Sequence, residues 1–333
     1  MNESLMKGII MNKYHEDRIK AVADKIIKLM EDEGENWFKP FSRYTKINST
    51  NFLSNKPFNI VSGNNYSGFN VLNLTLEQLV YSTPAWVTFK QAKQLGGSVL
   101  EGEKGTPICF FSQVSKKNED GDDSFYRLLK WTNVFNLDQT NLNAEDLIKK
   151  IVDKNKARKD EDLKIYNERK IATIDSIDQF VKNTKADIRH TDAGRCYFVP
   201  SQDYINMSPL DTWSGKGDIS AQDFYYSVLM HELTHWTGHK SRLNRDDSNP
   251  FKNENAHNQY AFEELVAEFG SAFMSATLGM TKTPIENHSQ YLAGWIKGLK
   301  DKPSLLMKAT AQAQKACDLM YSFQDAQPLK AVA

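Results

Sequence analysis

Apolar residues recur at helical spacing along several stretches of the chain. In residues 16–31 they stand three or four positions apart with charged residues between them, which predicts an amphipathic helix that ends near Gly34. Similar patterns and their stop signals predict further helices at residues 70–81, within 83–97, and at 220–238, 260–278 and 304–323.

Runs rich in β-branched and aromatic residues predict strands between these helices. The predicted strands lie at residues 98–100, 107–111, 125–136, 195–200 and 204–207. We expect residues 101–105 to form a turn between the first two strands, and the acidic residues 118–123 to form a hairpin loop before the third. The last two strands should form a hairpin packed beside helix 220–238.

Residues 141–189 differ in composition from both flanks. They are rich in Lys, Asp, Glu and Asn, are nearly devoid of aromatic residues, and carry helical patterns around 144–155 and 176–182, which indicates a charged connector. A length of 333 residues favours two domains. We therefore expect an α+β protein with a mixed α/β domain at residues 12–140 and a mainly helical domain, with a small β-hairpin or sheet, at residues 190–325.

Charge and cysteine content narrow the class of protein. The 42 basic and 42 acidic side chains cancel, so binding to nucleic acid or a membrane would need a local patch. Cys109, Cys196 and Cys317 have no paired spacing, which favours a reducing compartment over a disulfide framework. Near the start only residues 8–11 are apolar, and no run approaches the roughly 18 apolar residues of a membrane span. We expect a cytoplasmic protein.

The most informative stretch is MHELTHWTGH at residues 230–239. His231 and His235 stand four positions apart in a helix-prone run, so both imidazoles should project from one flank and hold a metal ion between them. Glu232 follows the first histidine, which would place its carboxylate beside the open coordination position, where it could take a proton from water. Ser220 with Asp223 predicts a capping box at the start of this helix.

A third metal ligand is needed, and the sequence leaves alternatives open. His239 follows Gly238, where the helix should end, and the longer pattern with a third histidine would place that histidine at the position of Ser241. Helix 260–278 offers a carboxylate instead, and a His, His, Glu set with water in the fourth place is a known catalytic zinc geometry. We favour Glu264 as the ligand and Glu268, one turn later, as an acceptor for a ligand imidazole. Glu263 lies on the other flank.

Aromatic rings and positive charge coincide in residues 36–115. This stretch holds seven Lys or Arg, three acidic residues and thirteen aromatic residues. Bases of single-stranded nucleic acid stack on exposed rings while Lys and Arg contact the phosphates. Most aromatic residues of any domain belong to its core, so composition alone leaves nucleic-acid binding and core packing both open.

Several blocks of the sequence resemble the ArdC-type antirestriction proteins of mobile genetic elements. The N-terminal blocks are NWFKPF (36–41), YSGFNVL (66–72), WVTFKQAKQLGG (86–97), GEKGTP (102–107) and VFNLDQ (134–139). The C-terminal blocks are HELTHWTGH (231–239), SRLNR (241–245), EELVAE (263–268) and ENHSQYLAGW (286–295). Their order along most of the chain outside residues 141–189 is more specific than any single motif.

The resemblance implies a single-stranded-DNA-binding domain followed by a zincin-like metallopeptidase domain, and a role in protecting DNA that enters a new host by conjugation from restriction. On this hypothesis His231, His235 and Glu264 hold zinc or another divalent cation, and Glu232 is the general base. Further candidates are Glu268, Glu263 and His239 as supporting or alternative ligands, and Tyr260, His288 and Tyr291 as oxyanion stabilisers. The DNA-binding candidates are Trp37, Tyr66, Phe69, Trp86, Lys90, Gln91, Lys93, Lys104, Arg127 and Trp131.

Two other functions remain open at this point. One is a non-catalytic DNA-binding shield whose metal is structural, and the other is a DNA-recruited metalloprotease that cleaves a host regulator. The sequence identifies neither a protein substrate nor an oligomeric state.

Overall fold

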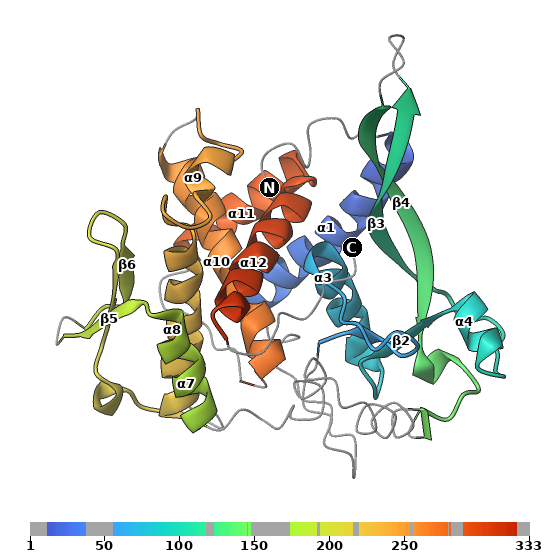
Figure 1. Ribbon diagram of the computed structural model, residues 1–333, viewed down its shortest axis with the longest axis horizontal. Helices are drawn as coiled ribbons and strands as arrows, with labels where there is room; N and C mark the ends of the chain where they lie inside the picture. The colour runs from blue at the N-terminus through green and yellow to red at the C-terminus, as the bar shows by residue number, and fades with distance from the viewer. Residues whose placement is uncertain are drawn as a thin grey trace.

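The computed structural model describes residues 12–37, 56–117, 123–144, 146–147, 174–191, 194–215, 220–253, 256–278, 280 and 289–324. A helical half and a half built around a long β-hairpin lie side by side in Figure 1. The described chain contains two separate sheets, one in each half. The predicted α+β class with two domains is confirmed.

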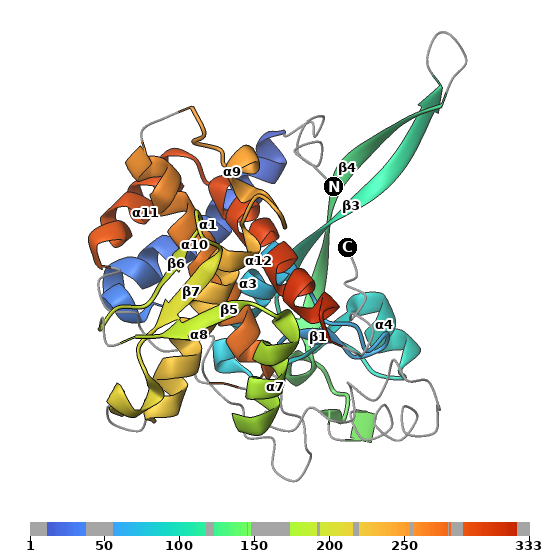
Figure 2. The same ribbon diagram turned by 60° about the vertical axis from the view of Figure 1, so that its left-hand side comes forward.

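The sheet of the N-terminal half has the strand order β1-β2-β4-β3. Strand β1 (Phe58–Asn59) pairs in parallel with β2 (Ala85–Thr88), which pairs antiparallel with β4 (Asp123–Asn136). Strands β3 (Thr106–Lys117) and β4 form a twisted two-stranded ribbon that extends well beyond the body of the molecule (Figure 2).

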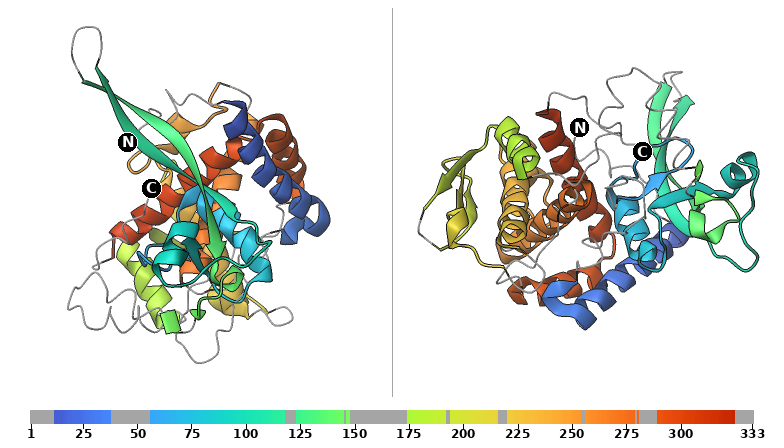
Figure 3. Two further views of the ribbon diagram at one scale, coloured as in Figure 1. Left: turned by 90° about the vertical axis from the view of Figure 1, so that its right-hand side faces the viewer. Right: turned by 90° about the horizontal axis from the view of Figure 1, so that it is seen from below.

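Two helices cover opposite faces of this sheet near its base (Figure 3). Leu74 of α3 (Gly68–Glu77) packs against Trp86 and Val134 on one face. Ala92 of α4 (Phe89–Gln94) packs against Val87 on the other face. Side chains alternate between the faces of a strand, so the neighbours Trp86 and Val87 belong to different cores.

The C-terminal half is built on α8 (Ala221–Thr237), α10 (Ala256–Leu278) and α12 (Leu305–Ser322). A small sheet of order β5-β7-β6 lies beside α8, and β6 is one of its edges. Its strands are β5 (Asp187–His190), β6 (Tyr197–Val199) and β7 (Tyr204–Met207). The remaining helices of this half are α7 (Ile174–Thr184), α9 (Arg245–Ser248) and α11 (Ser289–Asp301). Short 3-10 turns lie at Gly34–Asn36, Gln78–Val80, Leu137–Gln139 and Leu210–Thr212.

The first described helix crosses from one half to the other. Helix α1 (Lys13–Glu33) contacts α11 and α12, and Lys300 of α11 pairs with Glu31. Trp37, just beyond α1, packs edge-on against Phe269 of α10 and Trp295 of α11, with ring centroids 5.6 and 6.5 Å away. Residues 12–37 precede the N-terminal sheet in sequence, yet they help to form the core of the C-terminal half.

Most predicted elements are confirmed, including helix 220–238 and the hairpin of β6 and β7. The strand predicted at 98–100 is wrong: Val99 makes only an isolated bridge to Thr140, because this segment runs along the turn that follows β4. Most of the helical pattern at 144–155 lies outside the described residues. Within the described chain, no helix is both long enough and apolar enough to cross a membrane.

Candidate metal centre

Helix α8 is fixed at its start and packed closely against α10. The Ser220 hydroxyl accepts a hydrogen bond from the Asp223 amide at 3.1 Å, as the predicted capping box requires, and the helix ends at Gly238. Gly270 of α10 lies opposite Thr234 of α8, where an added Cβ would stand 2.5 Å from the threonine side chain. The glycine therefore lets the two helices approach where their polar residues meet.

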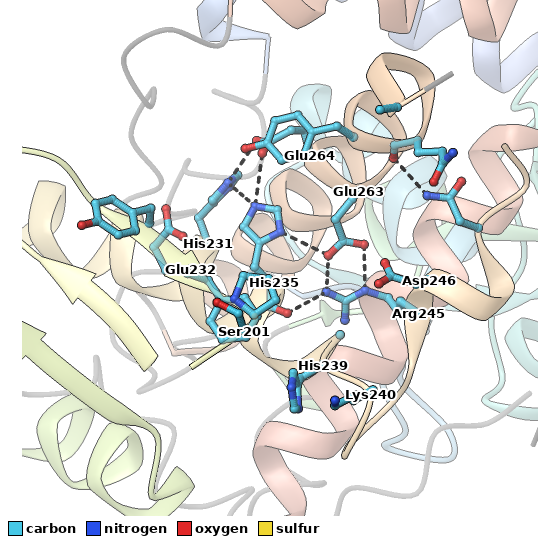
Figure 4. A pocket seen from close by; sticks show the side chains of 18 of the residues that line it. Ser201, His231, Glu232, His235, His239, Lys240, Arg245, Asp246, Glu263 and Glu264 are labelled. Atoms are coloured by element: carbon cyan, nitrogen blue, oxygen red, sulfur yellow. Dashed lines mark hydrogen bonds and ion pairs between the residues drawn. The ribbon is translucent and has the colours of Figure 1, made fainter. Parts of the chain in front are cut away.

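His231, His235 and Glu264 converge between these two helices (Figure 4). The two Nε2 atoms lie 3.0 Å apart, Glu264 Oε2 lies 3.3 Å from His231 Nε2, and Glu264 Oε1 lies 3.4 Å from His235 Nε2. Metal bonds of about 2.0–2.2 Å at tetrahedral angles separate neighbouring ligand atoms by roughly 3.3–3.5 Å. One ligand atom from each of the three residues lies within 4.8 Å of the other two, so the set is close to one face of a tetrahedral site for a divalent cation.

Two further carboxylates support the histidines from behind. His235 Nδ1 lies 3.1 Å from Glu263 Oε1, and His231 Nδ1 lies 3.5 Å from Glu268 Oε1. A proton on each Nδ1 turns the Nε2 lone pair towards the common centre, the usual arrangement behind ligand histidines. Glu263 projects from the flank expected in the sequence, and from there it reaches the second histidine.

Arg245 is the functional side chain that the sequence analysis missed. It is 3% exposed, and its guanidinium donates to both Glu263 oxygens and, at 2.6 Å, to the Thr237 hydroxyl. It also donates to the Thr234 carbonyl at the C-terminal end of α8. Gly238 makes room for this contact, because an added Cβ would stand 2.6 Å from the guanidinium. The only sequence signal was the position of Arg245 within the SRLNR block.

The charges of the centre depend on one another. Burial lowers the pKa of His231 to about 4, so this imidazole is neutral at neutral pH, the form that binds metals. Burial acts in the same direction on His235, but Glu264 and Glu263 outweigh it and raise its pKa well above 6.5. Burial opposes ionisation of Glu264, but His235 and His231 hold its pKa far below the ordinary value. The carboxylates thus stabilise one positive charge at the point where the three donors meet.

A cavity of about 740 Å³ opens over these donors. Glu232, 6% exposed, lines it beside His231, as Figure 4 shows, and β6 contributes Tyr197 and Phe198 to its lining. The cavity thus brings the carboxylate proposed as general base and an edge strand to the same space.

The other candidates divide into those that line this cavity and those that do not. Tyr260 hydrogen-bonds Glu264 and contacts the Tyr291 ring edge-on at 5.6 Å, and both tyrosines line the cavity. His239 lies in its wall but is not one of the converging donors, and its Nδ1 lies 2.7 Å from the Ser241 hydroxyl. His288 lies outside the described residues.

Three of the residues predicted to bind DNA are core residues instead. Trp37, Phe69 and Trp86 are 1%, 5% and 0% exposed, so none can stack on a base, and their prediction as DNA contacts is wrong. Each ring packs edge-on against another aromatic ring of the protein. Burying the large apolar surface of such a ring stabilises the fold.

The side chains of the remaining predicted DNA contacts differ in exposure and in their contacts within the protein. Lys90, Lys93 and Lys104 are exposed. The others make internal contacts or are not described: Tyr66 and Gln91 hydrogen-bond Asn59, Trp131 donates to His15, and the Arg127 side chain lies outside the described residues.

Comparison with known proteins identifies the family. Residues 16–171 match the N-terminal domain of anti-restriction factor ArdC, and residues 175–312 match a zincin-like metallopeptidase. The metal-free crystal structure of the antirestriction ArdC protein from the R388 plasmid is 34% identical, with a TM-score of 0.70, and the match covers 92% of this chain and 97% of that one. The chain belongs to the ArdC antirestriction family.

Other relatives of this ArdC-family protein are known in different contexts. The Mn(II)-bound structure of the R388 protein matches at 32% identity and a TM-score of 0.68, over 93% of this chain and 99% of that one. A DNA primase TraC of Escherichia coli is 30% identical over 321 residues, which cover 92% of this chain but only 27% of the primase. Protein y4eC of Sinorhizobium fredii is 26% identical over 93% of this chain and 94% of its own length.

Proposed function

We propose that this ArdC-family protein is a mobile-element antirestriction protein that binds single-stranded DNA and carries a zinc-dependent metallopeptidase site. The observation that carries the enzymatic part is the convergence of His231, His235 and Glu264 with Glu232 beside them. The plasmid source of the ArdC structures and the likeness to a DNA primase support a context of DNA handling on mobile elements. A cytoplasmic location is part of this proposal.

The side chains of the centre divide the work of peptide hydrolysis among them. When bound, zinc or another divalent cation would supply Lewis-acid polarisation of the scissile carbonyl and of a water molecule. His231, His235 and Glu264 would hold the cation. Glu232 accepts the proton of the attacking water at its carboxylate and passes it to the leaving nitrogen.

Tyr260 is suited to stabilise the oxyanion. Burial and the nearby Glu264 raise the pKa of its hydroxyl, so the hydroxyl keeps its proton and can donate a hydrogen bond. It reaches the Glu264 carboxylate and therefore stands beside the metal ligands. Tyr291 packs against its ring and holds it in place.

An extended peptide is the substrate class that fits the cavity best. β6 is an edge strand of its sheet, and its residues Tyr197 and Phe198 line the cavity. An edge strand offers unpaired backbone groups with which an extended peptide can pair. Such pairing would hold a peptide bond over the donors of α8 and α10.

Replacing Glu232 with Gln separates the catalytic proposal from the shield alternative. We expect the Glu232→Gln protein to bind metal and DNA like the wild type, but to lose protection of incoming single-stranded DNA in a transfer assay between restricting hosts. Unchanged protection would show that turnover is dispensable and would support a DNA-binding shield with a structural metal.

The DNA-binding part has its own test. Binding of a fluorescent single-stranded oligonucleotide should weaken steeply as salt rises, because phosphate contacts release counterions. Salt-independent binding, or none, would contradict this part alone.

A further inference from the structure

The burial of Trp37, Phe69 and Trp86 leaves open which rings face a DNA strand, and the structure offers Phe89. This side chain begins α4 and is 49% exposed, an unusual exposure for a large apolar ring with no polar group. The Phe135 ring of β4 lies beside it, with centroids 6.4 Å apart and planes tilted by 57°. Together the two rings form an apolar platform at the surface, hereafter the Phe89 platform.

Three exposed lysines lie on the segments next to this platform. Lys93 Nζ lies 4.8 Å from the centroid of the Phe89 ring, and Lys90 directly follows Phe89 in α4. Lys104 precedes Gly105, whose added Cβ would stand 2.9 Å from the Phe135 ring. The two segments beside the platform, α4 and the turn before β3, therefore both carry exposed lysines.

These lysines differ from others on the surface. Lys20 pairs with Asp24 at 2.7 Å and Lys297 with Asp301 at 2.8 Å, but none of the three lysines at the platform forms an ion pair with any residue in the described part of the chain. The carboxylate of Glu103, in the same turn as Lys104, accepts a hydrogen bond from Gln139 at 2.8 Å. Cations without acidic partners beside an exposed ring complement a polyanion that also presents flat apolar groups.

The platform is held in a fixed position by its surroundings. Thr88 and Gln91 form a capping box at the start of α4, and the Gln91 side chain also accepts a hydrogen bond from Asn59 at 2.9 Å. In Figure 3, α4 lies on the side of the N-terminal sheet that faces away from the helices of the metal centre. A strand bound there would leave the cavity over His231 and His235 open.

We propose that Phe89, supported by Phe135, stacks on an unpaired base of single-stranded DNA while Lys90, Lys93 and Lys104 contact the flanking phosphates. This inference rests on the proposed DNA-binding function and assigns that function to a surface. Stacking requires a base whose face is free, and in a duplex both faces are covered by neighbouring base pairs. The platform should therefore prefer a single strand to a duplex.

Fluorescence anisotropy with the full chain and a labelled oligothymidylate of about 15 nucleotides tests the proposal. We expect Phe89→Ala to weaken binding about ten-fold, because it loses one base stack, and Phe89→Trp, which keeps an aromatic ring, to bind like the wild type. Leu100→Ala, which shortens another exposed apolar side chain of the same half, should bind like the wild type. Circular dichroism checks that each variant is folded.

The lysines are tested by the salt dependence of the same binding. Lys93→Ala should reduce the slope of log affinity against log salt by about 0.7, the value for one phosphate contact on a single strand. Lys20→Ala, which removes a lysine that is already paired, should leave the slope unchanged.

Three results would overturn the proposal. If the wild type binds the oligonucleotide but Phe89→Ala and Lys93→Ala bind equally well, the platform is wrong while DNA binding stands. If a duplex of the same length binds as tightly as the single strand, base stacking on Phe89 is wrong. If the wild type binds no oligonucleotide, the proposed DNA-binding function itself fails.

Discussion

The metal centre and the Phe89 platform place their functional side chains in opposite surroundings. At the metal centre the donors are fully or largely buried, and they belong to a network: Glu263 lies behind His235, and Arg245 behind Glu263. At the platform the lysines are exposed to solvent. A buried network loses much when one member is removed, because the others are left without partners, whereas exposed contacts contribute small and separable amounts. Substitutions should therefore have large effects at the first region and small, salt-dependent effects at the second.

The sharpest contrast lies between two glutamates of α10. Glu264→Ala removes a converging donor and should weaken zinc binding by more than about 100-fold, since even a residue behind a ligand typically costs about 10–100-fold. Glu268→Gln, which alters the residue 3.5 Å from His231 Nδ1, should fall within that smaller range. Competition with a chromogenic chelator measures both. Equal losses would contradict the assignment of Glu264 as the ligand.

Trp37 tests whether residues 12–37 belong to the core of the C-terminal half. Trp37→Ala empties a ring site between Phe269 and Trp295, and we expect the free energy of unfolding to fall by about 3–5 kcal/mol. Tyr14→Ala, at an exposed position on α1, should change it by less than about 0.5 kcal/mol. Denaturant unfolding gives both values. If folded Trp37→Ala lost oligonucleotide affinity while its stability stayed unchanged, Trp37 would be a DNA contact and not a core residue.

Arg245 tests whether a residue that holds the hydrogen-bond partner of a metal ligand affects metal affinity. Arg245→Met leaves the partly buried Glu263 without its cation and should weaken zinc binding about 10–100-fold. Arg242→Met, on the same turn but bound to Asp203, should leave zinc affinity within about two-fold. In the double variant Arg245→Met/Glu263→Gln the two losses should not add, since both remove one interaction. Full additivity would mean that Arg245 does not act through Glu263.

The smallest expected effect at the metal centre concerns acid stability without metal. Burial opposes ionisation of Glu263, but Arg245 and His235 lower its pKa to about 2, against an ordinary 4.5. Because the pKa is lower in the folded state, the carboxylate stabilises the fold fully above about pH 4.5 and progressively less as the pH falls towards 2. Between about pH 5 and pH 3, the wild type should lose stability more steeply than Glu263→Gln. Parallel curves would contradict this.

The two regions also differ in how far sequence predicts them. Helical spacing alone brings His231 and His235 together, so the motif predicted how these two donors lie, while it left the third donor open. Trp86 and Phe89 lie three residues apart in one block, yet one is fully buried and the other half exposed, because β2 gives way to α4 between them. The side chain of Arg245 reaches α8 because the chain turns back just before it, where Asn244 adopts a left-handed conformation (φ 47°). No periodic pattern in the sequence indicates this turn.

One measurement tests the central claim that the metal centre and the DNA surface are separate: metal content and oligonucleotide affinity determined on the same preparations of wild type and His235→Ala. We expect about one divalent metal ion per wild-type chain, almost none in the variant, and equal affinity for single-stranded DNA in both. Metal retained at full content in His235→Ala, or oligonucleotide affinity lost together with the metal, would contradict the account.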